Sequence, residues 1–255
     1  MQEYLTKFHT LKLFTLNDAT AVLGKRGAAS ELLKNYISKG LLCKVRRNLY
    51  GVTNPATGHI LADQYEIASA ITSSAYISYH SALEYYGLAN QVFNEVFVSS
   101  ESRFNDFEFD GRIYHYCNSI SKTGIAVPMM SGKVRVTTLE RTVIDCIDRI
   151  DRSGGTEELL QSIQAIQYLD EKQLSAILAD YDKATLYKKA GFVLEHFRNQ
   201  LHLSKEFIEK CSNKNNVGSK VLTSAEDCPR FNSKWRIYVP EIFYDIAQST
   251  DYEGI

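Results

Sequence analysis

The chain has 255 residues, of which 44% are apolar and 23% charged, a composition typical of a folded globular protein and not of a disordered one. No run approaches the roughly 20 apolar residues that a membrane helix needs, and the N-terminus lacks the apolar block of a signal peptide. The five cysteines are scattered without a C-x-x-C pair, which argues against a zinc site and a disulfide framework and favours the reduced cytoplasm.

Charge is unevenly distributed along the chain, although the net charge is only −1. Residues 1–52 contain nine lysines and arginines and three acidic residues, a net charge of +6, whereas the rest of the chain carries −7. Because a basic segment attracts phosphate and an acidic one repels it, this asymmetry predicts that the N-terminal part meets nucleic acid and that the rest does not.

Two helices are predicted in the basic part. The first begins after Thr15, a residue type that favours the N-cap position, and Asp18 suits its first turn. Residues 24–27 break this helix, and a second helix is expected over 28–39, stopped by Gly40. The apolar side chains of the second helix recur on one face. The opposite face is formed by Glu31, Lys34, Asn35 and Ser38.

A basic hairpin follows the second helix. Two short runs with strand character, 41–45 and 49–52, flank a turn that contains Arg46, Arg47 and Asn48. The order of helix, turn, helix and hairpin is that of a winged helix-turn-helix, in which the second helix enters the major groove.

The residues after the hairpin predict a mixed domain. A loop at 54–58 is the expected boundary between a winged helix-turn-helix at 1–53 and a larger domain at 59–255. Strands are expected near 75–78, 95–99, 107–116, 133–138 and 235–239, with a turn at Asp110-Gly111. Helices are expected near 64–73, 81–87, 139–150, 156–166, 171–180 and 184–200, with N-caps at Ser81 and Thr137 and a polar loop over 212–227. The fold class is therefore α+β, a winged helix-turn-helix followed by a larger mixed α/β domain.

The basic part supplies side chains suited to DNA. Lys34 and Asn35 are the types that pair with guanine and adenine, so they are the predicted base readers. Phosphate contacts are expected from Lys25 and Arg26 beside the second helix and from Lys44, Arg46 and Arg47 on the hairpin. The polar residues Glu31 and Ser38 complete the helix face. The predicted DNA-binding set is Lys25, Arg26, Glu31, Lys34, Asn35, Ser38, Lys44, Arg46, Arg47 and Asn48.

Signals for an enzyme are weak. The nucleotide-binding, zinc-protease and serine-hydrolase motifs do not occur in the sequence. His80 stands beside Ser81, but adjacent helical residues do not face each other, so a local structural role is expected for the pair. The Asp-x-Lys match at residues 170–172 falls where a helix starts, which favours Asp170 as an N-cap over a metal ligand.

Arg141 and Asp145 are four residues apart on a predicted helix, a spacing that is more often structural than functional. The sequence therefore predicts a protein that is not an enzyme and that needs neither metal nor cofactor.

Five segments together resemble the AbiEi family, the antitoxins of type IV, abortive-infection toxin–antitoxin systems. Residues 14–19 with 41–50 resemble the family's N-terminal winged helix, and 76–88 resemble the segment just beyond it. Residues 138–145 and 230–236 resemble a later helix and the C-terminal strand, so the similarity spans most of the chain. One departure is that the family's Arg-Gly-Leu-Tyr wing has Asn48 in place of glycine, a residue type that tolerates positive φ.

The resemblance implies a repressor that binds inverted repeats in its own promoter as double-stranded DNA. It also implies that the second domain counteracts a nucleotidyltransferase-like toxin, without a required direct contact and away from any membrane. Two alternatives remain open: a protein-interaction module whose basic part binds an acidic partner, and a metal-dependent nuclease formed by the second domain.

Overall fold

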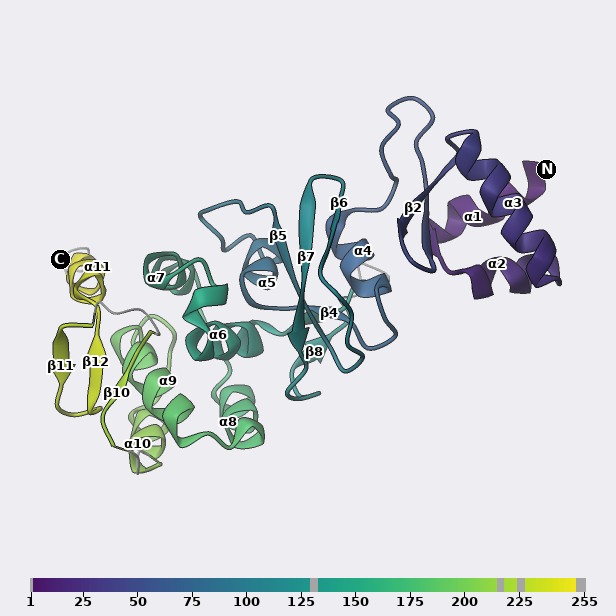
Figure 1. The fold of residues 1–255 in the computed structure, drawn as a ribbon. Helices are drawn as coiled ribbons and strands as arrows, with labels where there is room; N and C mark the ends of the chain where they lie inside the picture. Colours follow the sequence, from purple (N-terminus) through teal and green to yellow (C-terminus); the bar gives the residue numbers. More distant parts are fainter. Residues whose placement is uncertain (1, 129–132, 215–217, 224–227, 251–255) are drawn as a thin grey trace. The chain divides into compact units, whose positions relative to one another are not determined.

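The computed structural model describes residues 2–128, 133–214, 218–223 and 228–250. The chain folds as two compact units, each assembled from separate stretches of sequence. The first comprises Met1–Ile77, Asn94–Asn118 and Val127–Arg135, and the second comprises the remaining residues. Helices and strands occur in both units, which confirms the α+β class (Figure 1). The expected boundary at 54–58 lies inside the first unit, so the units divide the chain differently from a simple cut at that loop.

The basic part of the first unit is a winged helix-turn-helix. Its elements in chain order are α1 (Gln2–Leu11), β1 (Leu13–Phe14), α2 (Leu16–Leu23), α3 (Arg26–Ser38), β2 (Leu42–Arg46) and β3 (Leu49–Val52). The three strands form an antiparallel sheet in the order β1-β3-β2. Neither α1 nor β1 was predicted from the sequence. A strand as short as β1 carries little local signal, because its hydrogen bonds are supplied by β3.

Local signals define the ends of α2 and α3. Thr15 caps α2 and forms a complete capping box with Asp18, as its side chain accepts from the Asp18 N–H and the Asp18 carboxylate accepts from the Thr15 N–H. At the end of α3, Gly40 has a φ of 69° and its N–H donates to Ile37 O. The N–H of Leu41 donates to Tyr36 O, which completes a Schellman motif. Helix α3 begins two residues earlier than expected.

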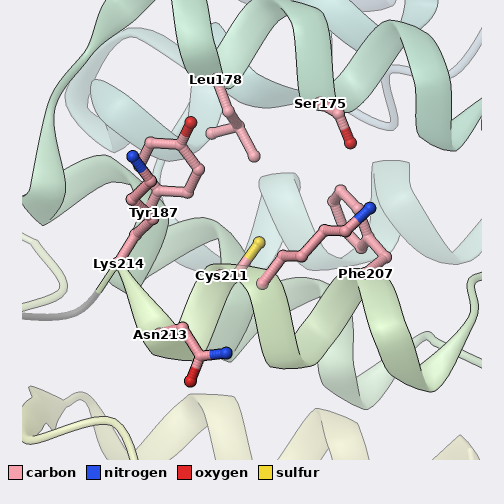
Figure 2. A pocket seen from close by; sticks show the side chains of 8 residues that line it. Ser175, Leu178, Tyr187, Phe207, Cys211, Asn213 and Lys214 are labelled. Carbon is pink, nitrogen blue, oxygen red and sulfur yellow. The ribbon is translucent and has the colours of Figure 1, made fainter.

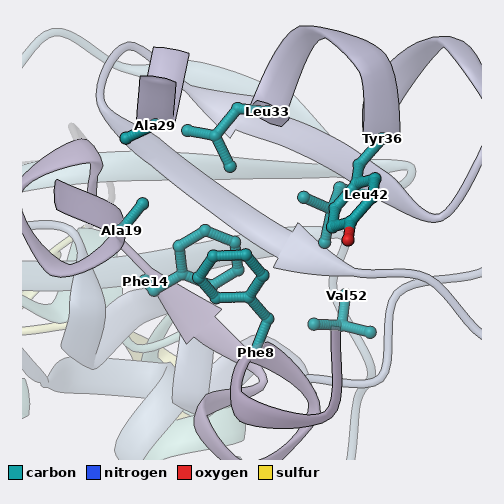
Figure 3. Close-up of a cluster of buried hydrophobic side chains, with 8 residues drawn as sticks. All are labelled: Phe8, Phe14, Ala19, Ala29, Leu33, Tyr36, Leu42 and Val52. Carbon is teal, nitrogen blue, oxygen red and sulfur yellow. The ribbon is translucent and has the colours of Figure 1, made fainter. Parts of the chain in front are cut away.

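One apolar cluster holds the winged helix-turn-helix together (Figure 3). Phe8 of α1 and Phe14 of β1 stack with ring centroids 4.3 Å apart, and both are fully or almost fully buried. The other buried members come from both helices and both wing strands: Ala19, Ala29, Leu33, Tyr36, Leu42 and Val52. The cluster thus joins α3 to the rest of the module and fixes which of its faces is left to solvent.

The remainder of the first unit is a helix and four neighbouring strands of a sheet. The helix is α4 (Gln64–Ala70), and the strands are β4 (Tyr76–Ile77), β5 (Glu95–Ser100), β6 (Phe107–Phe109) and β7 (Arg112–Asn118). The strand order is β6-β7-β5-β4, with β5 and β7 parallel and the other neighbours antiparallel. Asp110 and Gly111 both have positive φ, so the turn expected there is confirmed and divides the predicted 107–116 strand into β6 and β7.

The second unit is mainly helical. Its helices are α5 (Tyr79–Tyr85), α6 (Leu139–Asp148), α7 (Thr156–Gln164), α8 (Glu171–Tyr181), α9 (Ala184–His196), α10 (Lys205–Asn213) and α11 (Glu241–Thr250), with a short 3-10 turn at Ile150–Arg152. Its strands are the antiparallel pair β8 (Ile125–Ala126) and β9 (Val136–Thr137), and a sheet of β10 (Lys220–Val221), β12 (Ile237–Val239) and β11 (Arg230–Asn232) in that order.

Several expected boundaries in the second unit shift by a few residues. Ser78 and Thr138 are the N-caps of α5 and α6, so the caps expected at Ser81 and Thr137 were wrong. The polar loop expected over 212–227 is wrong at its start, where α10 continues to Asn213, and at Lys220–Val221, which form β10. Residues 218–219 and 222–223 are in neither helix nor strand, as expected. Residues 215–217 and 224–227 of that loop lie outside the described residues.

Candidate nucleic-acid interface

Helix α3 presents a polar face to solvent. Ala29, Leu33 and Tyr36 are buried against the apolar cluster. The residues of the predicted polar face are all exposed: Glu31, Lys34, Asn35 and Ser38. The Ser38 hydroxyl donates to the backbone oxygen of Asn35 at 2.8 Å. This division is what a recognition helix needs, since one face must dock and the other must read base edges.

The start of α3 lies beside cationic side chains. Lys25 is the N-cap and has extended backbone angles, and within the described residues its side chain makes no capping hydrogen bond. Arg26, expected just before the helix, is its first residue, and its guanidinium donates to the side-chain oxygen of Asn17 at 3.1 Å. The N–H groups of a helix N-terminus attract anions, so Lys25, Arg26 and the N-terminus of α3 all favour an anion at this end of the helix.

The wing is a tight hairpin whose tip is Arg47-Asn48. Arg46 and Leu49 pair across this two-residue turn. Asn48 has a φ of 62°, as its residue type allowed, and its side-chain oxygen accepts from the Leu16 N–H at 3.2 Å. Asn48 therefore shapes the turn and also joins the wing to the first turn of α2.

The helix-turn-helix and the wing enclose a basic hollow of about 500 Å³. It is lined by Leu16, Asn17, Arg26, Lys44, Arg47, Asn48 and Tyr50. Three of these side chains are cationic and none is acidic. Asn17 and Tyr50 were not among the residues predicted to bind DNA. Asn17, a polar residue in the first turn of the first helix, offered a signal because that helix crosses the phosphate backbone in this class of fold.

Arg46 is placed differently from the rest of the predicted set. It is only partly exposed, and its guanidinium carbon lies 5.2 Å from the ring centroid of Phe104 and 5.0 Å from that of Phe107. A β-bulge between Lys44 and Arg46 breaks the alternation of side chains along β2. Without this bulge, residues two apart on a strand would point to the same face.

His80, Ser81 and Asp170, whose side chains could in principle serve catalysis, are buried in a helix or cap one. His80 and Ser81 are buried inside α5, and His80 Nε2 lies 3.2 Å from Glu158 Oε1. Asp170 caps α8 by accepting from the N–H groups of Lys172 and Gln173, as expected, and the Lys172 hydrogen bond contributes most to holding the pKa of Asp170 below its usual value. In the described part of the chain, no three histidine, cysteine or carboxylate side chains are grouped so as to hold a metal ion.

A second hollow, of about 290 Å³, lies among α8, α9 and α10 (Figure 2). Leu178, Tyr187, Phe207 and Cys211 form its apolar wall. Burial raises the pKa of the Cys211 thiol to about 12, which keeps it protonated and therefore a poor nucleophile. This hollow consequently lacks the reactive group that a cysteine enzyme needs.

Comparisons with known proteins give a structural likeness without a family assignment. No protein-family model matches the sequence, and no curated protein matches it. The crystal structure of the RV2827C protein from Mycobacterium tuberculosis is similar, with a TM-score of 0.64, 12% sequence identity and coverage of 94% of this chain and 89% of that one. At this identity the likeness establishes the mixed α+β fold alone. Within the described residues, no helix combines the length and apolarity needed to cross a membrane.

Proposed function

We propose that the protein is a sequence-specific DNA-binding autoregulator and the antitoxin of a type IV toxin–antitoxin system. The observation that carries the DNA-binding part is the exposed basic and polar side chains of the winged helix-turn-helix. The exposed face of α3, the start of that helix, and the hollow lined by Arg26, Lys44 and Arg47 lie within one small module. The amphipathic α3 and the +6 charge of residues 1–52 support the same interpretation.

The residues divide into two roles. Lys34 and Asn35 read base edges in the major groove, where lysine suits guanine and asparagine suits adenine. Lys25, Arg26, Lys44 and Arg47 contact phosphates and set the register on the duplex. Glu31 and Ser38 border the readers on α3, and Asn48 holds the wing against α2.

The antitoxin part of the proposal rests on the AbiEi resemblance, which extends beyond the winged helix into both units. Three of the segments that carry it coincide with regular structure: 76–88 includes α5, 138–145 lies in the first turns of α6, and 230–236 includes β11. In this role the DNA-binding part represses the operon, and the rest of the chain counteracts a nucleotidyltransferase-like toxin.

The DNA-binding proposal is tested by fluorescence anisotropy with the roughly 200 bp upstream of the gene and with scrambled DNA, at two salt concentrations. We expect binding that prefers the upstream DNA and weakens as salt rises, because phosphate contacts release counterions. Equal and weak binding to both DNAs would contradict the proposal and favour the protein-interaction module.

Variants of the two base readers sharpen this test. We expect Lys34→Ala and Asn35→Ala each to cost about 1–3 kcal/mol of binding free energy on the upstream DNA and to relax specificity at one position. Lys39→Ala is the matched control, since Lys39 is an exposed lysine at the C-terminal end of the same helix. Lys39→Ala should leave the preference between bases unchanged, and equal losses for all three variants would contradict the assignment of the readers.

The antitoxin role is tested by co-expression with a nucleotidyltransferase-like protein encoded beside this gene. We expect growth arrest by that protein alone and recovery when this chain is present. A variant with Lys34→Ala and Asn35→Ala should still restore growth from an unrelated promoter, because neutralisation is assigned to the rest of the chain. Arrest that persists with the unaltered chain would contradict the antitoxin role.

A further inference from the structure

Arg46 is the one cation of the predicted DNA-binding set that is partly buried. It is the last residue of β2, immediately before the exposed wing tip. Burial lowers the pKa of the guanidinium, and its NH1 nitrogen is buried without a hydrogen-bond partner in the described residues. A buried donor that makes no hydrogen bond is costly, so its retention needs a compensating interaction.

The rings of Phe104 and Phe107 supply that interaction. Both centroids lie within the roughly 6 Å at which a cation is attracted to an aromatic face. The rings belong to the stretch 94–118, far along the chain from the wing but in the same compact unit. The contact therefore links the winged helix-turn-helix to β6 and to the segment just before it.

The receiving rings are held firmly. Phe107 stacks on Tyr114 across the β6–β7 hairpin, with ring centroids 4.9 Å apart and planes 7° from parallel. The rings of Phe104 and Tyr116 form a T-shaped pair with centroids 5.3 Å apart, and the N–H of Tyr116 donates to the Asp106 carboxylate at 2.8 Å. Arg46 thus meets a fixed aromatic surface, so this contact can determine where the wing lies.

Two ion pairs of the same unit are more open to solvent. Lys12 pairs with Glu66 of α4 at 2.8 Å, with the Lys12 side chain 47% exposed. His59, in the loop after the wing, lies 3.5 Å from Asp110, and these side chains are 72% and 49% exposed. Exposed ion pairs contribute little. The cation–aromatic contact of Arg46 is therefore the better candidate for holding the wing in place.

We propose that Arg46 is a positioning residue that fixes the wing on the sheet of its own unit, and that it makes no phosphate contact itself. The inference rests on the proposed DNA-binding function for its effect on affinity. Arg47, the next residue, is exposed and lines the basic hollow. The two neighbouring arginines should consequently affect DNA binding in different ways.

The first test is a salt titration of upstream-DNA binding with Arg46→Ala, Arg46→Lys and Arg47→Ala. Loss of a phosphate contact should reduce the slope of log affinity against log salt by about 1 for Arg47→Ala. Arg46→Ala should weaken binding about ten-fold at every salt concentration with the slope unchanged, a loss within the range of a cation–aromatic contact. Arg46→Lys should lie between the wild type and Arg46→Ala, since lysine keeps the charge but lacks the planar group.

A slope that falls by about 1 in Arg46→Ala would show that Arg46 contacts phosphate and would overturn the inference. Unchanged affinity in Arg46→Ala would overturn it as well, since no positioning effect would remain. Failure of the wild-type protein to prefer its upstream DNA would instead refute the proposed function, and the contact is then tested without DNA.

That second test is a thermal unfolding cycle with Arg46→Ala, Phe107→Leu and the double variant. If the guanidinium and the ring interact, the double variant should lower the Tm by less than the sum of the two single shifts. Leucine keeps apolar volume at position 107, so the variants should fold, which circular dichroism checks. Additive shifts would overturn the contact whether or not the protein binds DNA.

Discussion

Replacing Arg141 with methionine is expected to lower the free energy of unfolding by about 3–5 kcal/mol, the cost of removing one partner of a buried ion pair. Arg141 and Asp145 have side chains only 2% exposed, and Nε of Arg141 lies 2.8 Å from Oδ1 of Asp145. The guanidinium also donates to the backbone oxygen of Thr123 at 2.6 Å and covers the ring of Tyr181. Without Arg141, the Asp145 carboxylate stays buried with the Tyr181 hydroxyl as a remaining donor.

The loss of stability in Arg141→Met should depend on pH in a predictable direction. Burial already raises the pKa of Asp145, and the charge of Arg141 opposes the rise. In Arg141→Met the folded-state pKa of Asp145 should rise further above its unfolded value. A carboxyl with a raised folded pKa favours the folded state when protonated, so this contribution is lost as pH rises through that pKa. The stability deficit should therefore narrow as pH falls from neutral, which urea unfolding at several pH values measures.

Arg149→Ala is the matched control for Arg141→Met. Arg149 pairs with Asp151 at 2.7 Å, but both side chains are 45% exposed. An exposed ion pair of this kind contributes about 0–1 kcal/mol, so the variant should unfold almost like the wild type. Equal losses for the two variants would contradict the structural role given to the buried pair.

Phe14→Ala is expected to cost about 3–5 kcal/mol of stability in the winged helix-turn-helix and to abolish DNA binding with it. Phe14 is 2% exposed, stacks on Phe8 and belongs to the cluster into which α3 packs. Removal of the ring leaves a cavity beneath α3, because the surrounding side chains fill such space only partly. Thermal unfolding and anisotropy with the upstream DNA measure the two effects together.

Tyr168→Ala is the control for Phe14→Ala, since Tyr168 is an aromatic residue that is 59% exposed and belongs to the second unit. Its replacement should change stability by no more than about 0.5 kcal/mol and leave DNA binding intact. Retained DNA affinity in Phe14→Ala, with an unchanged Tm, would contradict the role of the cluster in supporting α3.

Much of the candidate interface could be predicted from local sequence. The cap at Thr15, the stop at Gly40, and the exposure of Lys34 and Asn35 all depend on neighbours within a few positions of the chain. Positive φ at Asn48 and the turn at Asp110-Gly111 are likewise properties of residue type and immediate context. The caps expected at Ser81 and Thr137 failed because more than one hydroxyl residue stood near each helix start.

Contacts between distant segments escaped the sequence reasoning. No local pattern distinguishes Arg46 from Arg47. The bulge in β2 and the rings of Phe104 and Phe107 turn Arg46 towards the protein, while Arg47 remains at the exposed tip. The pair of Arg141 and Asp145 was foreseen from its spacing, but its burial and its contact with Tyr181 were not.

The sequence by itself determined the α+β class, the helix-turn-helix with its wing, and the polar face of α3, because helix ends, turns and amphipathic periodicity depend on interactions within a few residues. Only the tertiary structure decided which cations face solvent, which line the basic hollow with Asn17 and Tyr50, and which stretches of chain combine into each compact unit. Those outcomes depend on burial against residues far away along the chain, and a one-dimensional pattern does not record such contacts.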